Sequence, residues 1–380
     1  MRIALIDSNP KPKMYPLPLL KIGAWRKSLG DQCVIFNNRL PEKDEFDEIW
    51  ITTTFTFDVS HALGIVREAK NRASRVLVGG VASSLLPKRF ESLGVEVHVG
   101  IHDEIESMHP DYSLLDTVPT YSISHTSRGC VRKCGFCMVN RLEPKFFNRK
   151  NWENDIHPDA DQIVFYDNNW FAKGFKGLKE DVKKLEKIIS NGKIKTIDFN
   201  QGLDARLLTE KTADLLKGLP IIPVRFAFDD MSEDGFYQNA VMMMNKRGFN
   251  DFSAYVLYNY NDTPQDFYYR LRESVRLQVE LKIRDVRSFP MRYQPIFDID
   301  KRRKYVGRNW TVAKRGSFKA ILALASTCGQ VSSSTIKEFE YWFGRDADEF
   351  DKLLSYPKIR ELSKRKKGAL RTMRAKGEWL

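Results

Sequence analysis

The chain has 380 residues, 42% hydrophobic and 12% aromatic, so it is long enough to bury a full core, and we expect two domains that fold unaided. It carries 62 Lys and Arg against 49 Asp and Glu, and the net charge of +13 favours anionic partners without naming one. The first residues, MRIALIDSNP, lack the regions of a signal peptide, and no apolar run approaches the roughly 18 residues that span a bilayer, which argues against a membrane protein and predicts a cytoplasmic location.

The N-terminal part of the chain alternates short apolar runs with amphipathic segments. The expected elements, in chain order, are a strand at 2–7, a helix at 16–30, strands at 32–37 and 48–57, a helix at 60–73, a strand at 75–80, a helix at 84–94 and a strand at 95–100. Strands alternating with helices predict a parallel, doubly wound, Rossmann-like sheet. Residues 104–120 lose this periodicity and are expected to form a linker.

A second alternation of strands and helices follows, with longer spacing. Six strands are expected at 120–127, 161–169, 195–202, 223–230, 253–262 and 285–294, with helical patterns at 177–192, 209–219 and 264–280 between them. This pattern predicts a parallel (βα)6 partial TIM barrel whose working face lies at the carboxyl ends of the strands. Beyond about residue 308 only helical patterns remain, at 318–326 and 334–344. The predicted fold class is α/β, with domains at 1–112, 113–307 and 308–380.

Three of the five cysteines lie close together with the spacing C-x3-C-x2-C, at Cys130, Cys134 and Cys137. In a reducing compartment such a cluster is expected to hold metal or to do redox chemistry. A structural zinc site needs four ligands, and no second cysteine pair is present, so His125 or His157 would have to supply the fourth. In a [4Fe–4S] cluster, three protein thiolates leave one iron open to a small molecule. Cys33 and Cys328 lie in apolar surroundings and are expected to be buried small hydrophobes.

With this spacing, with Phe136 just before the last cysteine and with a strand before it, the loop resembles that of the radical S-adenosylmethionine (SAM) enzymes. The resemblance covers roughly residues 120 to 300 by pattern. It implies that Cys130, Cys134 and Cys137 bind three irons of a [4Fe–4S] cluster, while SAM chelates the fourth. It also implies reductive cleavage of SAM to a radical that attacks a substrate, and an electron donor such as flavodoxin or ferredoxin.

The resemblance also suggests further contacts to SAM by position, with Phe136 beside the cofactor. In the family the SAM amino group is held at the end of the second strand, where this chain has YDNN in place of the frequent Gly-Gly-Glu run, so Asp167 and Asn168 are candidates. Candidates for the ribose and carboxylate contacts are Asn200, Gln201, Arg225 and Asp229. Each of them is alternatively a polar residue that ends a strand or caps a helix. The residues expected to line the substrate or adenine pocket are Met291, Arg292 and Tyr293.

The N-terminal part resembles the cobalamin-binding domain that precedes the barrel in one radical SAM subgroup. Gly79 and Gly80 would let the backbone approach a nucleotide tail closely. The Asp-x-His-x-x-Gly signature that supplies a histidine to cobalt is absent, because no histidine precedes His61. Two interpretations stay open: a domain that binds cobalamin without that histidine, and a Rossmann-like domain kept for packing or for substrate contact.

The surplus of positive charge is concentrated near the C-terminus. Residues 301–319 contain eight basic residues and no acidic one, and residues 358–380 contain nine basic and two acidic residues. With the interleaved aromatics Tyr305, Trp310 and Phe318, these segments favour nucleic acid as a partner, although a solvated helix face explains the charge equally well. We therefore expect a radical SAM enzyme that modifies a substrate such as nucleic acid. The alternatives are a cobalamin-dependent radical SAM methyltransferase and a non-catalytic, zinc-containing nucleic-acid-binding protein.

Overall fold

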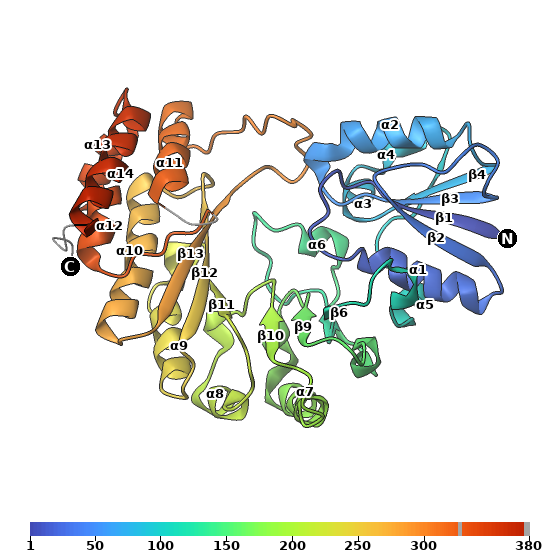
Figure 1. Cartoon of the computed structure of the whole chain (residues 1–380), viewed down its shortest axis with the longest axis horizontal. Helices are drawn as coiled ribbons and strands as arrows, with labels where there is room; N and C mark the ends of the chain where they lie inside the picture. Colours follow the sequence, from blue (N-terminus) through green and yellow to red (C-terminus); the bar gives the residue numbers. More distant parts are fainter. Residues whose placement is uncertain (326–328, 376–380) are drawn as a thin grey trace. The chain divides into compact units, whose positions relative to one another are not determined.

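The computed structural model describes residues 1–325 and 329–375, and Cys328, one of the two expected buried thiols, lies outside them. The chain forms two compact units (Figure 1). The first unit comprises Met1–Ala172, Lys183–Thr196 and Pro295–Lys304, and the second comprises Lys173–Val182, Ile197–Gln294 and Tyr305–Leu380. Within the described ranges, every helix is too short or too polar to cross a bilayer.

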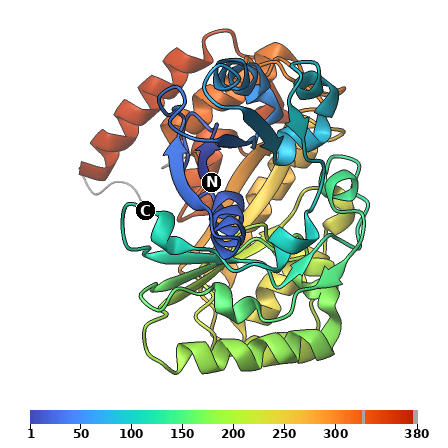
Figure 2. The ribbon, with the colours of Figure 1, turned by 90° about the vertical axis from the view of Figure 1, so that its right-hand side faces the viewer.

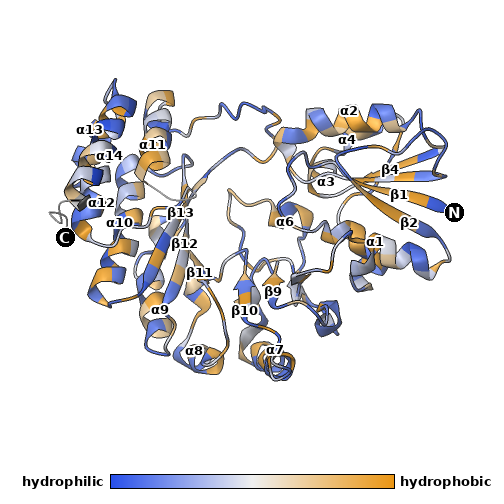
Figure 3. Cartoon of the chain, viewed as in Figure 1, coloured by the Kyte–Doolittle hydropathy of each residue, from blue (hydrophilic) through white to orange (hydrophobic). Residues whose placement is uncertain are grey.

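A five-stranded parallel sheet begins the first unit, with its strands in the order β2-β1-β3-β4-β5. These strands are β1 (Arg2–Asp7), β2 (Gln32–Asn37), β3 (Glu48–Thr52), β4 (Arg75–Gly79) and β5 (Glu96–Val97). Helices α1 (Leu17–Ser28) and α2 (Val59–Ala69) cover opposite faces of the sheet (Figures 1 and 2). Alternate apolar residues of β1 pack against Leu19 of α1 and against Val66 of α2, and Figure 3 shows the apolar character of this strand. The predicted parallel, doubly wound sheet is confirmed.

Three elements of this sheet are shorter than the sequence predicts. The strand expected at 48–57 ends at Thr52, and a short 3-10 helix, η1 (Thr56–Asp58), follows it. The helix expected at 84–94 is divided at Pro87 into α3 (Val81–Leu85) and α4 (Pro87–Glu91). Proline has no backbone N–H and disfavours helical geometry in the residue before it, so the helix restarts there. The last strand is reduced to β5.

Residues 103–115, here called the strap, fill the place of the expected linker. The strap contains α5 (Asp103–Ser107) and η2 (Tyr112–Leu114). The strap is anchored to the rest of the unit: the Tyr112 hydroxyl accepts a bond of 2.9 Å from the Ile123 N–H, and the Lys27 ammonium donates to Asp111 over 2.6 Å. The linker prediction is wrong, because loss of periodicity marks irregular backbone but does not distinguish a flexible segment from a packed one.

Two strand pairs complete the first unit. β6 (Tyr121–Ser124) pairs in parallel with β9 (Gln162–Phe165). β7 (Ser127–Arg128) pairs antiparallel with β8 (Phe147–Asn148), and the short helix α6 (Val139–Leu142) lies between them in the chain. The β7–β8 ribbon therefore closes the base of the segment that carries the three clustered cysteines. A 3-10 helix, η3 (Trp152–Asp155), precedes β9, and η4 (Trp170–Lys173) and α7 (Gly174–Ile189) follow it.

The six strands expected after residue 120 are all present. The four that remain are β10 (Thr196–Phe199), β11 (Val224–Ala227), β12 (Asp251–Tyr258) and β13 (Asp285–Arg292). The last three form a parallel sheet in the order β11-β12-β13. The elements between them are η5 (Ala205–Leu207), α8 (Glu210–Leu216), η6 (Met231–Glu233), α9 (Phe236–Asn245) and α10 (Pro264–Glu280), of which α10 coincides with its predicted bounds. The α/β class with parallel sheets is confirmed.

Four helices end the described chain: α11 (Val312–Ala325), α12 (Ile336–Phe343), α13 (Ala347–Leu354) and α14 (Ile359–Ala375). Phe318 is fully buried, and the Phe267 ring meets it edge to face at 4.9 Å. Trp310 is 4% exposed and contacts Tyr258 and Phe267. The expectation that Trp310 and Phe318 offer stacking surfaces to nucleic acid is therefore wrong, because both rings belong to the aromatic core of the second unit. Tyr305 is half-buried and packs on Tyr293.

Candidate active site

The three clustered cysteines lie on one loop, residues 129–138, between β7 and α6, and each is half-buried. Gly129 starts this loop with a φ of +75°, and a Cβ atom there would lie 2.2 Å from the Lys145 carbonyl oxygen. Only glycine fits such a left-handed and crowded position without a shift of the backbone. The loop therefore starts at a fixed point one residue before Cys130.

Two hydrogen-bond donors point at the Cys130 sulfur. The Arg132 N–H points at the Cys130 sulfur over 3.3 Å, and the Asn169 side-chain amide donates to the same sulfur over 3.6 Å. The Cys137 N–H donates to the Cys134 carbonyl over 3.1 Å, so these two residues share one turn, with Phe136 half-buried inside it. Donors to a thiolate stabilise its negative charge and tune the potential of a bound cluster.

The donor set fits an iron–sulfur cluster better than a single ion. Across the described ranges, no three His, Cys, Asp or Glu side chains converge in the way that a site for one metal ion requires. A mononuclear zinc site needs four converging ligands, whereas a [4Fe–4S] cluster places each cysteine on a different iron. Three thiols on one loop are one fewer than a structural zinc site needs, and they equal the number of protein ligands in a [4Fe–4S] cluster with one open iron.

Both histidines proposed as a fourth zinc ligand have hydrogen-bond partners other than the cysteines. His125 is 8% exposed, and its Nε2 accepts from Arg128 over 3.0 Å. Burial, reinforced by the neighbouring cations, holds the pKa of His125 well below its usual range, so the ring is neutral. His157 is half-buried, and its Nδ1 accepts from the Asp159 N–H over 3.1 Å.

Glu143, which the sequence did not single out, holds the start of the cysteine loop. One of its oxygens accepts from the Arg128 guanidinium over 2.6 Å. The other accepts from the Gly129 N–H over 2.8 Å and from the Asn168 amide over 2.7 Å. One carboxylate thus joins the residue before Cys130 to the segment that follows β9. No spacing pattern in the sequence points to Glu143, because the residues that it contacts lie 14 to 25 positions away.

Asp167 and Asn168, the candidates for the SAM amino group, lie beside the cysteine loop. Asp167 is 3% exposed, and its carboxylate accepts from the Thr126 N–H, the Thr126 hydroxyl and the Ser127 hydroxyl over 2.8, 2.7 and 2.6 Å. It therefore fixes the chain just before the loop. Asn168 is half-buried and donates to Glu143. A contact of either residue with SAM stays a prediction.

The other SAM candidates belong to the second unit. Arg225 forms a two-pronged ion pair with Asp198, at 2.6 and 2.9 Å, so this guanidinium already has a carboxylate partner. The Asn200 carbonyl accepts from the Tyr255 hydroxyl over 2.7 Å, while Gln201 is exposed. These assignments to SAM also stay predictions.

Asp229 lies two residues beyond the end of β11, and one of its carboxylate oxygens accepts from the Leu257 N–H over 2.9 Å. Burial, together with the nearby Glu233, raises the pKa of Asp229 to about 7. Its carboxyl group is therefore shared between the protonated and ionised forms near neutral pH. Of the three residues expected to line the pocket, Met291 is exposed, and Arg292 and Tyr293 are half-buried.

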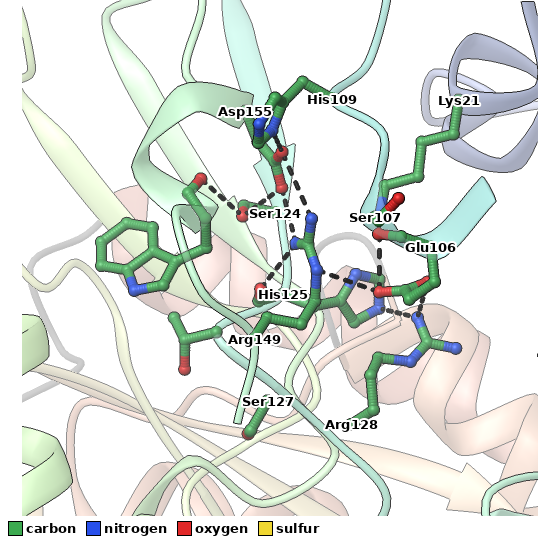
Figure 4. A network of polar contacts seen from close by, with 12 residues as sticks. Lys21, Glu106, Ser107, His109, Ser124, His125, Ser127, Arg128, Arg149 and Asp155 are labelled. Carbon is green, nitrogen blue, oxygen red and sulfur yellow. Dashed lines mark hydrogen bonds and ion pairs between the residues drawn. The ribbon is translucent and has the colours of Figure 1, made fainter. Parts of the chain in front are cut away.

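A network of buried charges surrounds the base of the cysteine loop (Figure 4). At its centre Glu106 of the strap lies 3.0 Å from Arg149, 3.4 Å from Lys21 and 3.8 Å from Arg128. Asp155 lies 2.7 Å from Arg149 on the other side. The carboxylates offset part of the cost of burying these cations.

The network also holds the backbone of β6 and the segment after it. Arg149 donates to the His125 carbonyl over 2.8 Å, and Ser124 and His109 contact the Asp155 carboxylate at 2.7 Å each. Helix α1, the strap, β6 and the cysteine loop are therefore joined through ion pairs (Figure 4). This arrangement could not be predicted from the sequence, because Glu106 and Asp155 lie in segments without periodicity.

Lys21 should make the stability of the chain depend on pH in the alkaline range. Burial lowers the pKa of Lys21 from 10.5 to about 8, although Glu106 partly opposes the shift. The unfolded chain then holds this proton more tightly than the folded one, so stability should rise as the pH rises from about 8 toward 10.5, by about 3 kcal/mol at most. Urea unfolding at several pH values should show this rise in the native chain and a smaller one in Lys21→Met. A constant difference between the two proteins would contradict the assignment.

The carboxyl edge of the N-terminal sheet lies beside the cysteine loop within the first unit, because α3 contacts α6. The strand order reverses between β1 and β3, which is where open parallel sheets of this kind bind ligands. Gly80 has a φ of +102°, and a Cβ atom on it would lie 2.5 Å from the Thr53 carbonyl oxygen, whereas Gly79 has open space around it. Gly80 thus serves the packing of the chain on Thr53, and Gly79 leaves room for a ligand.

Comparisons with known proteins agree with this geometry. No family model matches the chain. Ribosomal protein uS12 methylthiotransferase RimO from Stenotrophomonas maltophilia, strains K279a and R551-3, is 26% identical over 145 residues, which cover 33% of this chain and 32% of the relative. RimO from Xanthomonas axonopodis pv. citri is 23% identical over 145 residues, covering 33% and 31%. The chain thus matches about a third of the length of these curated relatives.

Among solved structures, the chain resembles the radical S-adenosylmethionine methyltransferase TsrM from Kitasatospora setae, whose structure contains cobalamin and a [4Fe–4S] cluster. The match has a TM-score of 0.60 and 12% sequence identity, and it covers 79% of this chain and 77% of TsrM. At this identity the likeness shows a shared fold. The chain is thus similar in sequence to RimO methylthiotransferases over about a third of its length, and it shares its fold with the radical SAM methyltransferase TsrM.

Proposed function

We propose that this protein is a radical SAM enzyme in which Cys130, Cys134 and Cys137 hold a [4Fe–4S] cluster. The observation that carries the proposal is the loop itself. Three half-buried thiols follow a glycine whose backbone is left-handed, and two hydrogen-bond donors point at the Cys130 sulfur. When bound, the cluster supplies the electron that cleaves the carbon–sulfur bond of SAM. The chain's own part is to hold the loop and to give its thiolates hydrogen bonds.

We propose that SAM contacts Phe136, Asp167 and Asn168 of the first unit. Asn200, Gln201 and Arg225 stay candidate SAM contacts on the sequence pattern alone. Asp167 supports this proposal indirectly, since it fixes the chain before the loop through Thr126. The proposed domains are the Rossmann-like sheet at 1–112, a partial barrel at 113–307 and a basic helical region at 308–380. The parallel strands and the fold shared with TsrM support this arrangement. A cytoplasmic location, where thiols stay reduced, and a flavodoxin-like or ferredoxin-like electron donor complete the proposal.

Cobalamin-dependent methyl transfer is the second candidate function. The carboxyl edge of the N-terminal sheet lies beside α6, and Gly79 leaves open space there. RimO is named a methylthiotransferase and TsrM a methyltransferase, and the TsrM structure contains cobalamin. No residue before His61 in this chain is a histidine, so a corrinoid would bind without a histidine from the β1–α1 segment.

Anaerobic reconstitution tests both candidates in one preparation. Iron and sulfide analysis should give about four of each per chain. The reduced protein should form 5′-deoxyadenosine from SAM, measured by mass spectrometry, or transfer a methyl group when it is loaded with a corrinoid, whose visible spectrum reports binding. A protein that takes up zinc alone, or that holds a cluster but turns over SAM in neither way, would contradict the proposal.

We propose nucleic acid as the partner of helix α14. Four of its basic side chains are exposed and have no ion pair with the residues that the structure describes, namely Arg360, Lys364, Arg365 and Arg371. Changing these four residues to glutamine should weaken RNA or DNA binding and reduce the salt dependence of binding by a slope of about 3 to 4. Salt titrations monitored by fluorescence anisotropy measure both effects.

A matched control is available on α7, which also carries four exposed cations: Lys176, Lys179, Lys183 and Lys187. Changing them to glutamine alters the net charge by the same amount but leaves α14 intact. If both four-fold variants lower the slope equally, the effect is one of net charge, and α14 is not the contact surface.

A further inference from the structure

Arg128 ends β7 and directly precedes the cysteine loop. It precedes Cys130 by two residues, and its guanidinium lies between two carboxylates. It donates to Glu143 over 2.6 Å. It also lies 3.8 Å from Glu106 and donates to the neutral His125 ring over 3.0 Å (Figure 4). We propose that Arg128 and Glu143 are positioning residues that set both the conformation of the cysteine loop and the charge around its cluster. This inference rests on the proposed function.

The position of Glu143 explains how one side chain can act on Cys130 from two sides. Through the Gly129 N–H it holds the backbone directly before Cys130. Through Asn168 it holds the neighbour of Asn169, whose amide donates to the Cys130 sulfur. Glutamine in place of Glu143 keeps the shape but loses the charge, so its bonds to the Arg128 guanidinium and the Gly129 N–H become weaker.

The burial of the pair makes its charges effective. The side chains of Arg128 and Glu143 are 15% and 14% exposed, and that of Glu106 is 14% exposed. Solvent screens such charges less than it screens exposed ones, so a change in one of them is felt by neighbouring groups. Removing Glu143 leaves an excess of positive charge beside the loop, whereas removing Arg128 leaves an excess of negative charge.

We therefore predict that two single variants shift the midpoint potential of the cluster in opposite directions. Glu143→Gln should favour the reduced cluster and move the potential to more positive values, and Arg128→Gln should move it to more negative values. The double variant should return toward the native value. Damage to the fold alone would not give opposite signs or a rescue. The Glu143→Gln cluster is a weaker reductant, so cleavage of SAM should slow by about 10- to 100-fold.

The test has a first part that needs no cluster. In the metal-free protein, hydrogen exchange at the Gly129 amide should be faster in Glu143→Gln than in the native chain, because the bond to the carboxylate is weakened. Glu153→Gln is the matched control, since the Glu153 carboxylate forms its ion pair with Lys184 of α7. Unchanged exchange in Glu143→Gln, or equal acceleration in Glu153→Gln, would overturn the proposed role.

The second part uses the reconstituted protein, with potentials measured by redox titration followed by electron paramagnetic resonance. Opposite shifts with recovery in the double variant support the inference, as does loss of the cluster in one single variant with its return in the double variant. Shifts of the same sign, no shift, or loss of the cluster in all three variants would overturn it. A native protein that binds no cluster contradicts the proposed function instead, and the exchange experiment still decides the role of Glu143 in the loop.

Discussion

Alanine in place of Cys134 is expected to abolish the formation of 5′-deoxyadenosine from SAM. The side chain lies in the middle of the three, and a cluster with two cysteines would leave a second iron without a protein ligand. The turn that follows depends on the Cys134 carbonyl, which accepts from the Cys137 N–H, and alanine keeps this carbonyl. The variant should therefore fold normally, but it should hold less iron and form no product. Iron content, and mass spectrometry of the anaerobic reaction with SAM, measure the two losses.

Cys33→Ala provides the control for this experiment. Cys33 lies in the N-terminal sheet, packs with Leu5 and Trp50, and is 8% exposed. Burial raises the pKa of this thiol to about 11, so it is protonated and inert at neutral pH. Its loss should reduce the melting temperature slightly and leave iron content and product formation unchanged. A Cys134→Ala protein that formed as much product as Cys33→Ala would refute the cluster assignment.

Alanine in place of Gly129 is expected to have the second largest effect. The left-handed backbone costs a non-glycine residue about 1–3 kcal/mol, and the added Cβ would lie 2.2 Å from the Lys145 carbonyl oxygen. The chain must shift where β7 pairs with β8, so the bond from the Gly129 N–H to Glu143 should be lost. We expect lower stability and incomplete uptake of the cluster, measured by thermal unfolding and by iron content after reconstitution.

Gly316→Ala is the matched substitution, because Gly316 lies within α11 and has nothing within 4 Å of the added Cβ. Alanine favours a helix interior by up to about 1 kcal/mol over glycine, so this variant should be as stable as the native chain or more stable. If Gly129→Ala kept full stability and a full complement of iron, the start of the loop would not need the conformation described above.

The sequence predicted most strands and several helices because their apolar residues recur with a regular period. β1, β2 and α10 lie at their predicted bounds, and all six strands expected after residue 120 are present. Periodicity reports which residues are buried, but it does not report what buries them. For this reason the sequence of the basic segment 301–319 does not reveal that Trp310 and Phe318 lie in the core.

The cysteines of the candidate site could be predicted because their spacing carries chemical information that needs no partner. The residues that hold the loop could not. Glu106 lies in a segment without periodicity, and Glu143 acts through residues 14 to 25 positions away. Asp167 was placed correctly at the end of a strand, yet the structure shows its carboxylate bonded to Thr126 and Ser127. The position of a residue at the end of a strand predicts that it lies at the edge of the sheet. It does not predict which neighbouring group forms hydrogen bonds with its side chain.

The packed strap limits where the polypeptide can be cut for expression as separate fragments. Division after residue 112, at the boundary that composition suggests, would place the Glu106 carboxylate on one fragment and the guanidinium groups of Arg128 and Arg149 on the other. In the C-terminal fragment Arg128 would keep Glu143 and Arg149 would keep Asp155, but both would lose the carboxylate that they share, and loss of a partner from a buried ion-pair network is destabilising. Fragments that are meant to retain the three thiols in working order should therefore begin ahead of α5.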